Sequence, residues 1–544
     1  MAKTKELLGR DNSNFLYDRA CTDIASLLMQ KEIVTGKELS WLIKEISGKY
    51  NLSSIPKYTD ILRLIPDESD CRKILIRKPI KSVSGVLVIA IMAKPYPCPH
   101  GRCIYCPGGV EFETPMSYTG NEPITKKAQE LDYDPRLQIL SKINHYYSRG
   151  HDISKVELVI VGGTFPFMPL DYQVQFVKDA YDALNGEDTK SNTLAEAKAL
   201  NEESRIRCVG FSMETKPDYC KKEHIDTMLE LGMTRIEIGV QTLDESILRK
   251  VNRGHNLYDV FESFRIAKEA GFKIVAHMMP GLPGSSPDND LKDFKTIFDD
   301  PRLRPDMLKI YPTLVLRNTG LQKMYEKGTY RSYSDDEFTD LLVNVKKITP
   351  QWVRIMRIQR EIESPDIIAG PRAGNLRQLI QKKMFDKGFE CNCIRCREIG
   401  HREISNRNTD PVLMRIEYTS SNGTELFLSI EDEKTASLFG FLRLRRLKNP
   451  HRNELRTFSG EPTAMVRELH VFGRMTKIGN KFSKDAFQHR GYGSSLLHAA
   501  EEIAANEFGL NKISVISAVG TRQYYRKFGY CNDGPYMSKT LMTK

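Results

Sequence analysis

The sequence has no run of eighteen apolar residues, no internal repeat and no extended low-complexity segment. Without such a run no transmembrane helix is expected, and no amphipathic stretch suggests an anchor on a membrane surface. The first residues, Met1 to Glu6, also lack the apolar segment of a signal peptide. We therefore expect no contact with membranes and a cytoplasmic location, in which the 11 cysteines are thiols or metal ligands and not disulfides.

The composition is that of a globular protein, with 40% hydrophobic and 28% charged residues over a length of 544. A chain of this length folds as roughly three or four domains. We predict a basic helical domain over residues 1–75, a barrel domain over 76–360, a linker with a zinc site over 361–405 and an α/β domain over 406–544. Two stretches have the composition of linkers, the Pro/Gly-rich Ile362–Gly374 and the polar Ser405–Asp410.

Six short apolar runs, several of them β-branched, alternate with stretches of helical periodicity in the predicted barrel domain. This alternation is typical of a parallel β/α barrel, whose active site forms at the carboxyl ends of the strands. We therefore predict a partial (β/α)6 barrel with a site at that edge. The runs cover residues 85–92, 156–161, 206–211, 235–240, 272–276 and 307–311.

Three cysteines follow the first run, with the spacing Cys98-x4-Cys103-x2-Cys106. In a chain without disulfides this pattern indicates a metal or cluster site, and the alternative is a chance trio of thiols. Three thiolates fit a [4Fe–4S] cluster with one iron left open, which could bind a small molecule and pass it an electron. Plant-type ferredoxins share the local spacing but complete the cluster with a distant cysteine; nothing around Cys208, the next one here, resembles a ligand loop.

Polar or glycine-containing residues lie at the ends of the later runs, where a barrel site is expected. Each of them alone is equally an ordinary turn or barrel-core residue. In chain order they are Gly162, Gly163, Thr164, Glu214, Gln241, His277 and Lys309.

A second compact cysteine trio, Cys391, Cys393 and Cys396, suits ligation of zinc by thiolates. Structural zinc takes four ligands in a tetrahedron. His401 is the nearest candidate for the fourth ligand, although a residue from the barrel could replace it. The alternative is a set of unpaired thiols in an exposed loop.

Near the carboxyl end a glycine-rich turn lies between a predicted strand, Met465–Phe472, and a predicted helix, Ser494–Ile503. Such a turn presents backbone N–H groups and the positive end of the helix dipole to an anion, here a pyrophosphate. The motif alone is weak, but a further strand at Ile513–Ala518 and a tyrosine pair support it. The residues concerned are Gln488, His489, Arg490, Gly491, Tyr492, Gly493, Ser494, Tyr524 and Tyr525.

Basic residues exceed acidic ones, with 81 Lys and Arg against 70 Asp and Glu, and they gather in two groups, the first of which has no intervening acid. Such patches bind phosphates without specifying sequence, so they favour a folded RNA as partner. For any single residue the alternative is a solvated surface charge. The first group is Arg72, Lys73, Arg77, Lys78 and Lys81; the second is Arg443, Arg445, Arg446, Lys448, Arg452 and Arg456.

The cysteine run and the following Gly162-Gly163 resemble the radical S-adenosylmethionine (SAM) enzymes, although one residue is added between the first two cysteines and Thr164 replaces an acidic residue. With these two departures the motif resembles that of the family of Elongator catalytic subunits, of the single-chain archaeal type, which modify the wobble uridine of tRNA. So do the segments 105–109, 237–241, 252–255 and 276–280. The carboxyl-terminal motif resembles the GNAT acetyltransferases.

The resemblance implies an α/β fold with a partial radical SAM barrel, a carboxyl-terminal GNAT domain and a small helical tRNA-binding domain at the amino end. It implies a [4Fe–4S] cluster, SAM and acetyl-CoA, whose acetyl carbon would be added to C5 of uridine to give 5-carboxymethyluridine. SAM would be held by Gly162, Gly163, Thr164, Glu214 and Gln241, and acetyl-CoA by the glycine-rich turn, Tyr525 and the strand residues Glu468, Leu469, His470 and Val471. The residues predicted to be catalytic are Tyr525, Tyr524, Glu468, His277 and Lys309.

Two other functions fit the same motifs. A protein lysine acetyltransferase with a structural cluster would acetylate lysine without consuming SAM. An RNA-binding scaffold would bind tRNA without turning over either cofactor. The sequence is compatible with a homo-oligomer and contains nothing that requires partner subunits.

Overall fold

The computed structural model describes residues 2–30, 35–66, 69, 71–75, 85–151, 153–401, 410–472 and 491–542. The chain divides into two compact units. One consists of Met1–Leu87 with Leu140–Ser154, and the other of Val88–Ile139 with Lys155–Lys544. No helix among the described residues has the length and apolar character needed to cross a membrane.

The first unit is helical. It contains α1 (Ala2–Gln30), α2 (Gly36–Lys49), α3 (Tyr58–Leu62) and α4 (Arg72–Leu75). Apolar residues at helical spacing, such as Ile24, Leu28 and Ile43, form a separate core. The first turn of α2 is fixed by a capping box between Thr35 and Glu38.

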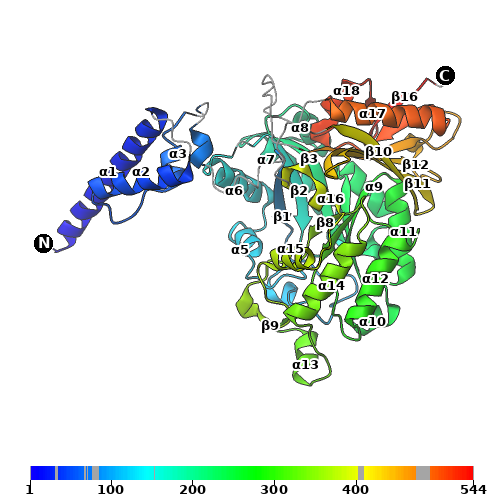
Figure 1. Ribbon diagram of the computed structural model, residues 1–544, viewed down its shortest axis with the longest axis horizontal. Coiled ribbons are helices and arrows are strands. Elements are labelled where there is room, and N and C mark those ends of the chain that lie inside the picture. Colours follow the sequence, from blue (N-terminus) through cyan, green and yellow to red (C-terminus); the bar gives the residue numbers. More distant parts are fainter. Residues whose placement is uncertain are drawn as a thin grey trace. The chain divides into compact units, whose positions relative to one another are not determined.

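The second unit contains a seven-stranded parallel half barrel, in the order β1-β2-β3-β4-β5-β6-β8 (Figure 1). Every pair from β2/β3 to β6/β8 is parallel. The predicted barrel fold is confirmed, with β8 as an additional strand. The strands are β1 (Leu87–Met92), β2 (Lys155–Val161), β3 (Arg207–Thr215), β4 (Arg235–Gln241), β5 (Lys273–Met278), β6 (Met307–Ile310) and β8 (Arg354–Arg357).

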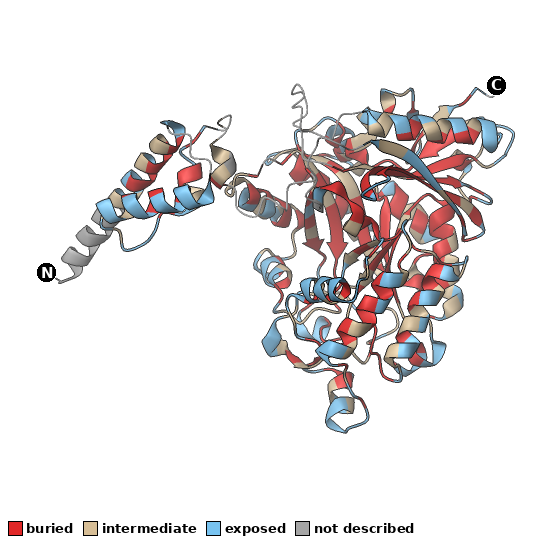
Figure 2. Ribbon diagram, viewed as in Figure 1, coloured by how far each residue is buried: buried red, intermediate tan, exposed pale blue. Residues whose placement is uncertain are grey.

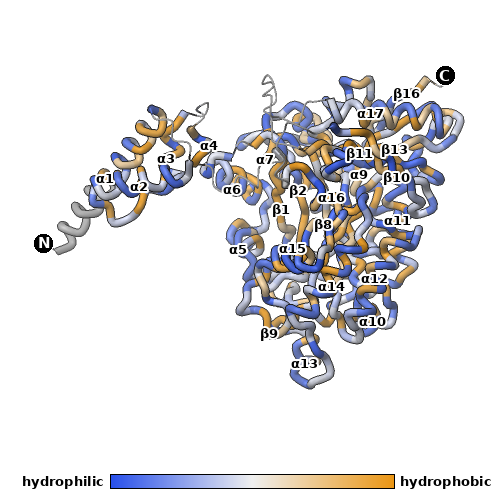
Figure 3. Tube along the Cα trace, in the orientation of Figure 1, coloured by the Kyte–Doolittle hydropathy of each residue, from blue (hydrophilic) through white to orange (hydrophobic). Residues whose placement is uncertain are grey.

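Helices cover the outside of this sheet, and their apolar faces pack onto strands that are almost wholly buried (Figure 2). Figure 3 shows the corresponding band of hydrophobic residues along β1 and β2. These helices are α5 (Pro123–Glu130), α7 (Leu170–Asn185), α8 (Leu194–Asn201), α9 (Lys222–Glu230), α10 (Glu245–Lys250), α11 (Leu257–Glu269), α12 (Pro287–Asp299) and α14 (Asp335–Ile348). Helix α6 (Pro135–Tyr147) continues into the first unit, and α13 (Gly320–Glu326) lies beside β7.

The carboxyl-terminal sheet is mostly antiparallel, in the order β10-β11-β12-β13-β14-β16-β15. Its strands are β10 (Pro411–Ser420), β11 (Gly423–Asp432), β12 (Ser437–Arg446), β13 (Ala464–Val471), β14 (Lys512–Val515), β15 (Cys531–Asp533) and β16 (Tyr536–Thr540). The parallel pair β13/β14 is joined only over Ala464–Val466, after which β13 continues without β14 beside it. Helix α17 (Tyr492–Glu502), continued by a π-helical turn to Glu507, and the short α18 (Arg522–Arg526) complete this fold.

The predicted linker Ile362–Gly374 is folded. Strand β9 (Ile367–Ala369) pairs with β7 (Val315–Leu316), and Ile367 packs against Leu314 and Leu316. Helices α15 (Leu376–Asp386) and α16 (Ile394–Arg397) follow. The other predicted linker, Ser405–Asp410, lies outside the described residues except for Asp410.

The prediction that the second group of basic residues binds RNA is wrong for its first two members, Arg443 and Arg445. Arg443 and Arg445, together with Arg467, have fully buried side chains. They face carboxylates at the amino end of the barrel: Arg467 donates to Asp306 and Arg445 to Glu269. Because buried guanidinium groups require such partners, these arginines join the two sheets of the second unit and leave no charge for phosphates.

Candidate functional site

The loop after β1 brings the three predicted cluster ligands into one packed group. Cys103 and Cys106 are buried with Met116, and Cys98 packs against them. Cys98 Sγ lies 3.7 Å from Thr164 Oγ1, at the end of β2. The cysteine loop and the loop after β2 therefore form one surface at the carboxyl edge of the sheet.

The two glycines after β2 allow this close approach. Gly162 and Gly163 have φ angles of 115° and 88°, in the region that favours glycine. A Cβ atom at Gly163 would lie 3.3 Å from Met116 Cβ, on the cysteine loop. Both the backbone conformation and the space thus require glycine next to the thiolates.

The sequence did not single out three side chains that lie around the cysteines, the imidazole of His100 and the cations Lys216 and Arg253. His100 Nε2 lies 3.1 Å from Cys103 Sγ, and Lys216 Nζ lies 3.0 Å from His100 Nδ1. Arg253 Nη1 is 3.9 Å from the same sulfur. Burial, followed by Lys216 and Arg253, lowers the pKa of His100 to about 4. The motifs that contain Lys216 and Arg253 were visible in the sequence, but only the fold places them beside the thiolates.

Several buried polar atoms around this loop have no hydrogen-bond partner among the described residues. They include Tyr105 Oη, Arg253 Nε, Gln241 Oε1 and both ring nitrogens of His255. Such atoms are costly unless a ligand satisfies them. Three cysteines, a cationic surround and unpaired polar groups together fit an anionic iron–sulfur cluster with a polar ligand at its open iron.

Gln241 ends β4 in a conformation that is uncommon for its residue type. Its φ is +74°, and the pairing of β4 with β5 shifts register just before it. Gln241 pairs with Met278 after this shift, at the carboxyl edge of the sheet. Glu214 lies at the equivalent end of β3 and is half-buried.

Deeper in the barrel, Glu214 and His277 meet Glu237, which was not predicted as a site residue. One ligand atom from each lies within 4.8 Å of the others. His277 Nε2 is 2.9 Å from Glu237 Oε2, and Lys309 Nζ donates to the same oxygen. Although burial alone would raise the pKa of Glu237, Lys309 and His277 hold it well below its usual range, so the carboxylate is charged.

The glycine-rich turn leads into α17 as predicted by its sequence pattern. Gly491 is the N-cap, with φ of +84°, and Ser494 Oγ donates to its carbonyl oxygen at 2.7 Å. A Cβ atom at Gly493 would lie 2.7 Å from Tyr524 Oη, so the turn and the tyrosine pair are adjacent. Tyr492 is half-buried, and Gln488, His489 and Arg490 lie outside the described residues.

Tyr525 is buried, whereas Tyr524 is partly exposed. Burial, followed by the neighbouring Tyr524, raises the pKa of Tyr525 above its ordinary value, so the phenol stays protonated. Among the described residues its hydroxyl has no hydrogen-bond partner. Its proton is therefore free to be donated to a ligand.

The strand residues Glu468, Leu469, His470 and Val471 lie on the part of β13 that has left β14. Leu469 packs toward the core of the carboxyl-terminal sheet. Glu468 accepts a hydrogen bond from Arg443 Nε at 2.8 Å. His470 stacks on Phe441, with ring centroids 5.9 Å apart.

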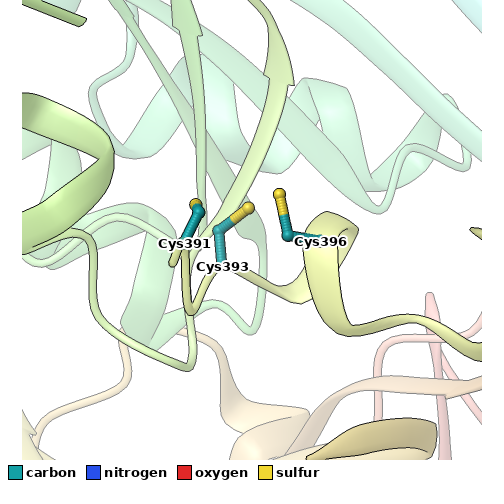
Figure 4. A group of neighbouring side chains, drawn as sticks. All are labelled: Cys391, Cys393 and Cys396. Atoms are coloured by element: carbon teal, nitrogen blue, oxygen red, sulfur yellow. The ribbon is translucent and has the colours of Figure 1, made fainter. Parts of the chain in front are cut away.

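The second cysteine trio is compact (Figure 4). The sulfurs of Cys391, Cys393 and Cys396 lie within 4.8 Å of one another. Cys391 and Cys393 are buried, so the alternative of thiols in an exposed loop is wrong. Lys346 Nζ lies 3.4 Å from Cys396 Sγ. The side chain of His401 lies outside the described part of the chain.

In the first group of basic residues, Arg72 has a structural role. Its guanidinium Nη1 donates to the carbonyl oxygens of Leu62 and Ile65, at the end of α3. It is therefore not the free phosphate contact that we predicted. The side chain of Lys73 and the residues Arg77, Lys78 and Lys81 lie outside the described residues.

Four family models match the chain. They are the ELP3 N-terminal domain over residues 17–83, the Radical SAM superfamily over 95–296, the Radical_SAM C-terminal domain over 305–386 and the Acetyltransferase (GNAT) family over 400–530. The radical SAM and GNAT matches agree with the two sheets described above. They carry the cysteine loop and the glycine-rich turn, respectively.

Related proteins match over nearly the whole chain. Elongator complex protein 3 of Schizosaccharomyces pombe is 42% identical, covering 97% of this chain and 99% of that protein. The tRNA uridine(34) acetyltransferase of Methanocaldococcus jannaschii is 44% identical, covering 89% and 90%. The solved structure of archaeal Methanocaldococcus infernus Elp3 without residues 1–46 superposes with a TM-score of 0.74 and 40% identity, covering 84% of this chain and all of that one.

Proposed function

The chain belongs to the family of Elongator complex protein 3 and the tRNA uridine(34) acetyltransferases, and from this premise we propose that it converts the wobble uridine of tRNA to 5-carboxymethyluridine with SAM and acetyl-CoA. The observation that supports the proposal is that two separate candidate cofactor sites lie in one compact unit. One is the three-cysteine loop, and the other is the glycine-rich turn beside Tyr525. A lysine acetyltransferase with a purely structural cluster would have no use for the glycine pair and the unpartnered buried polar atoms beside the cysteine loop.

Cys98, Cys103 and Cys106 would hold the [4Fe–4S] cluster, and Gly162, Gly163, Thr164, Glu214 and Gln241 would hold SAM. When bound, these groups supply a carbon radical, which suits C5 of uridine because that carbon is a weak nucleophile. The cations Lys216 and Arg253 offset the negative charge of the thiolates, and the neutral His100 imidazole lies between Lys216 and Cys103. Buried polar atoms at the strand ends would donate to and accept from SAM.

The glycine-rich turn would bind the pyrophosphate of acetyl-CoA at the amino end of α17. Water would hydrolyse the thioester, and Tyr525, which burial keeps protonated, would be the proton donor to the thiolate of CoA that leaves. Glu468 and Tyr524 are further candidates at the thioester, although the Glu468 carboxylate already accepts a hydrogen bond from Arg443.

An anaerobic assay of the reconstituted protein with SAM, acetyl-CoA and bulk tRNA tests the proposed function. We expect 5′-deoxyadenosine and 5-carboxymethyluridine, both dependent on tRNA. Formation of acetyl-lysine without consumption of SAM would support the lysine acetyltransferase instead. Binding of tRNA with no turnover of either cofactor would support a scaffold.

Replacing Gly493 with valine is expected to weaken acetyl-CoA binding by about tenfold or more. The added Cβ would meet Tyr524 Oη at 2.7 Å and displace a residue next to Tyr525. Calorimetric titration with acetyl-CoA measures the effect. Gly48→Val in α2 is the matched control, because a Cβ there has nothing within 4 Å. An unchanged affinity in Gly493→Val would remove this turn from the site.

Tyr525→Phe is expected to slow thioester cleavage by about a hundredfold while leaving acetyl-CoA affinity unchanged, since only the proton donor is lost. Release of free CoA measures the rate. Tyr530→Phe is the matched control: its ring lies 5.9 Å away, but its hydroxyl donates to Glu501. Equal rates in wild type and Tyr525→Phe would indicate that the Tyr525 side chain only packs in the core and donates no proton.

We further propose that Cys391, Cys393 and Cys396 hold a structural zinc ion, with His401 as the candidate fourth ligand. The purified wild type should then contain about one zinc ion per chain, and Cys393→Ser should contain almost none. Elemental analysis measures the content. Cys531→Ser serves as control because Cys531 is exposed on β15. Zinc retained in Cys393→Ser would contradict the assignment.

A further inference from the structure

Four side chains from four neighbouring strands meet inside the barrel. Glu214 comes from β3, Glu237 from β4, His277 from β5 and Lys309 from β6. Glu237 is only 1% exposed, and it occupies the third position of β4, deeper than Gln241 at the strand end. The group therefore lies below the carboxyl edge at which the cysteine loop and the glycine pair are placed.

One carboxylate oxygen of Glu237 accepts no hydrogen bond among the described residues. Oε2 contacts both His277 Nε2, at 2.9 Å, and Lys309 Nζ. Oε1 has no hydrogen-bond partner among the described residues, and the nearest cation, Arg235 Nη2, is 3.7 Å away. A buried oxygen without a donor is destabilising. Its retention in the barrel indicates that a ligand supplies the donor.

The chemistry of the group favours an organic ligand over a metal ion. Both oxygens of Glu237 already face cations, Lys309 Nζ at Oε2 and Arg235 Nη2 3.7 Å from Oε1, so a metal ion bound there would meet two positive charges. A metal at Oε2 would also have to displace the Lys309 ammonium. The Lys309 ammonium has three protons. It donates one of them to Glu237, so the others can be donated to a carbonyl oxygen of a ligand. The site therefore presents an acceptor, the Glu237 carboxylate, beside a donor, the Lys309 ammonium. A neutral imide matches both, because it has an N–H flanked by carbonyl groups.

Tyr311 adds a flat apolar wall. Its ring packs edge-on against His277, with centroids 5.4 Å apart. Glu214, one of the residues proposed to hold SAM, has a carboxylate oxygen within 4.8 Å of the Glu237 and His277 ligand atoms. A planar base held by Glu237 would consequently lie beside the proposed source of the radical.

Resting on the proposed function, we propose that Glu237 reads the target base by accepting the N3–H of uracil, while Lys309 donates to a flanking carbonyl. Cytosine has a lone pair at N3, which would face the carboxylate and be repelled. Glu237 is thus a specificity-determining residue that selects uridine over cytidine. In the amide of Glu237→Gln, the NH2 group can donate to N3 of cytosine, so this variant should lose the selection.

The test uses binding, so that it does not depend on turnover. Anticodon stem-loops with uridine, cytidine or N3-methyluridine at the wobble position are titrated into the reconstituted protein with SAM present. We expect the wild type to prefer uridine to cytidine by about tenfold or more, and Glu237→Gln to reduce this ratio by about tenfold. N3-methyluridine should bind the wild type as weakly as cytidine does.

Glu157→Gln is the matched control. Glu157 belongs to the same ion-pair network, but its Oε1 is already engaged by Arg235, so the ratio should not change. Equal binding of uridine and N3-methyluridine by the wild type would overturn the inference even if Glu237→Gln did not fold. A folded Glu237→Gln variant that prefers uridine to cytidine as strongly as the wild type does would also overturn the inference. If the base preference holds but no 5-carboxymethyluridine forms in the anaerobic assay, the proposed reaction fails and the base-reading role stands.

Discussion

Replacing Cys98, Cys103 and Cys106 together with alanine is expected to abolish the iron content of the protein and its formation of 5′-deoxyadenosine. The three thiols lie in one packed group after β1, where they would be the ligands of the cluster. Without thiolates, the cationic groups around Cys103 have nothing to hold iron. Iron analysis, the visible absorption spectrum and the anaerobic assay measure the effect.

Cys220→Ala is the control for this experiment. Cys220 is also buried in the barrel domain, but it lies outside the loop, and burial raises its pKa to about 12, so it remains an inert thiol. The control variant should keep its iron and its SAM cleavage. A triple variant that still cleaves SAM reductively would show that the chemistry does not depend on this loop, and the central assignment would fail.

Arg467→Met is expected to lower the free energy of unfolding by about 3–5 kcal/mol, because it leaves buried carboxylates without their main partner. Arg467 donates to Asp306 at 3.0 and 2.5 Å and to Glu425 at 3.0 Å, and all three side chains are fully buried. Asp306 precedes β6 of the barrel, while Glu425 and Arg467 belong to β11 and β13. The loss should therefore separate the two sheets of the second unit.

Denaturant titration followed by circular dichroism measures this change. Arg415→Met is the control, since Arg415 pairs with Glu417 and Glu507 at the surface, where an ion pair contributes at most about 1 kcal/mol. Restoring neutrality with Asp306→Asn in the Arg467→Met background should recover part of the lost stability. A midpoint for Arg467→Met equal to that of the wild type would mean that the network does not hold the sheets together.

Most of the fold could be predicted from local patterns in the sequence. The β-branched runs predicted six parallel strands, because a strand buried on both faces must be apolar along its length. Strand β8, Arg354–Arg357, escaped prediction because it is four residues long and begins and ends with arginine. The folded character of Ile362–Gly374 was also missed, since its proline and glycine content suggested a linker while the pairing of β9 with β7 depends on residues about fifty positions away.

The partners of the charged side chains were the feature that could least be predicted from the sequence. A cluster of arginines suggests a phosphate-binding surface, because the sequence shows which basic residues are adjacent but not which acidic residues pair with them in the fold. Arg443 and Arg445 are instead buried against Asp306, Glu468, Glu269 and Glu425, which come from distant parts of the chain. Arg72 similarly donates to backbone carbonyls of α3.

The sequence by itself determined the kinds of chemistry that this protein can carry: the cysteine spacing, the glycine pair and the glycine-rich turn are local, and each dictates its own backbone conformation and donor set. The tertiary structure alone decided which side chains share a site. It placed Lys216 and Arg253 beside the Cys98–Cys106 loop and Glu237 beside His277 and Lys309. The physical reason is that a parallel sheet aligns residues from separate strands at one depth, and that register is set by packing across the whole barrel.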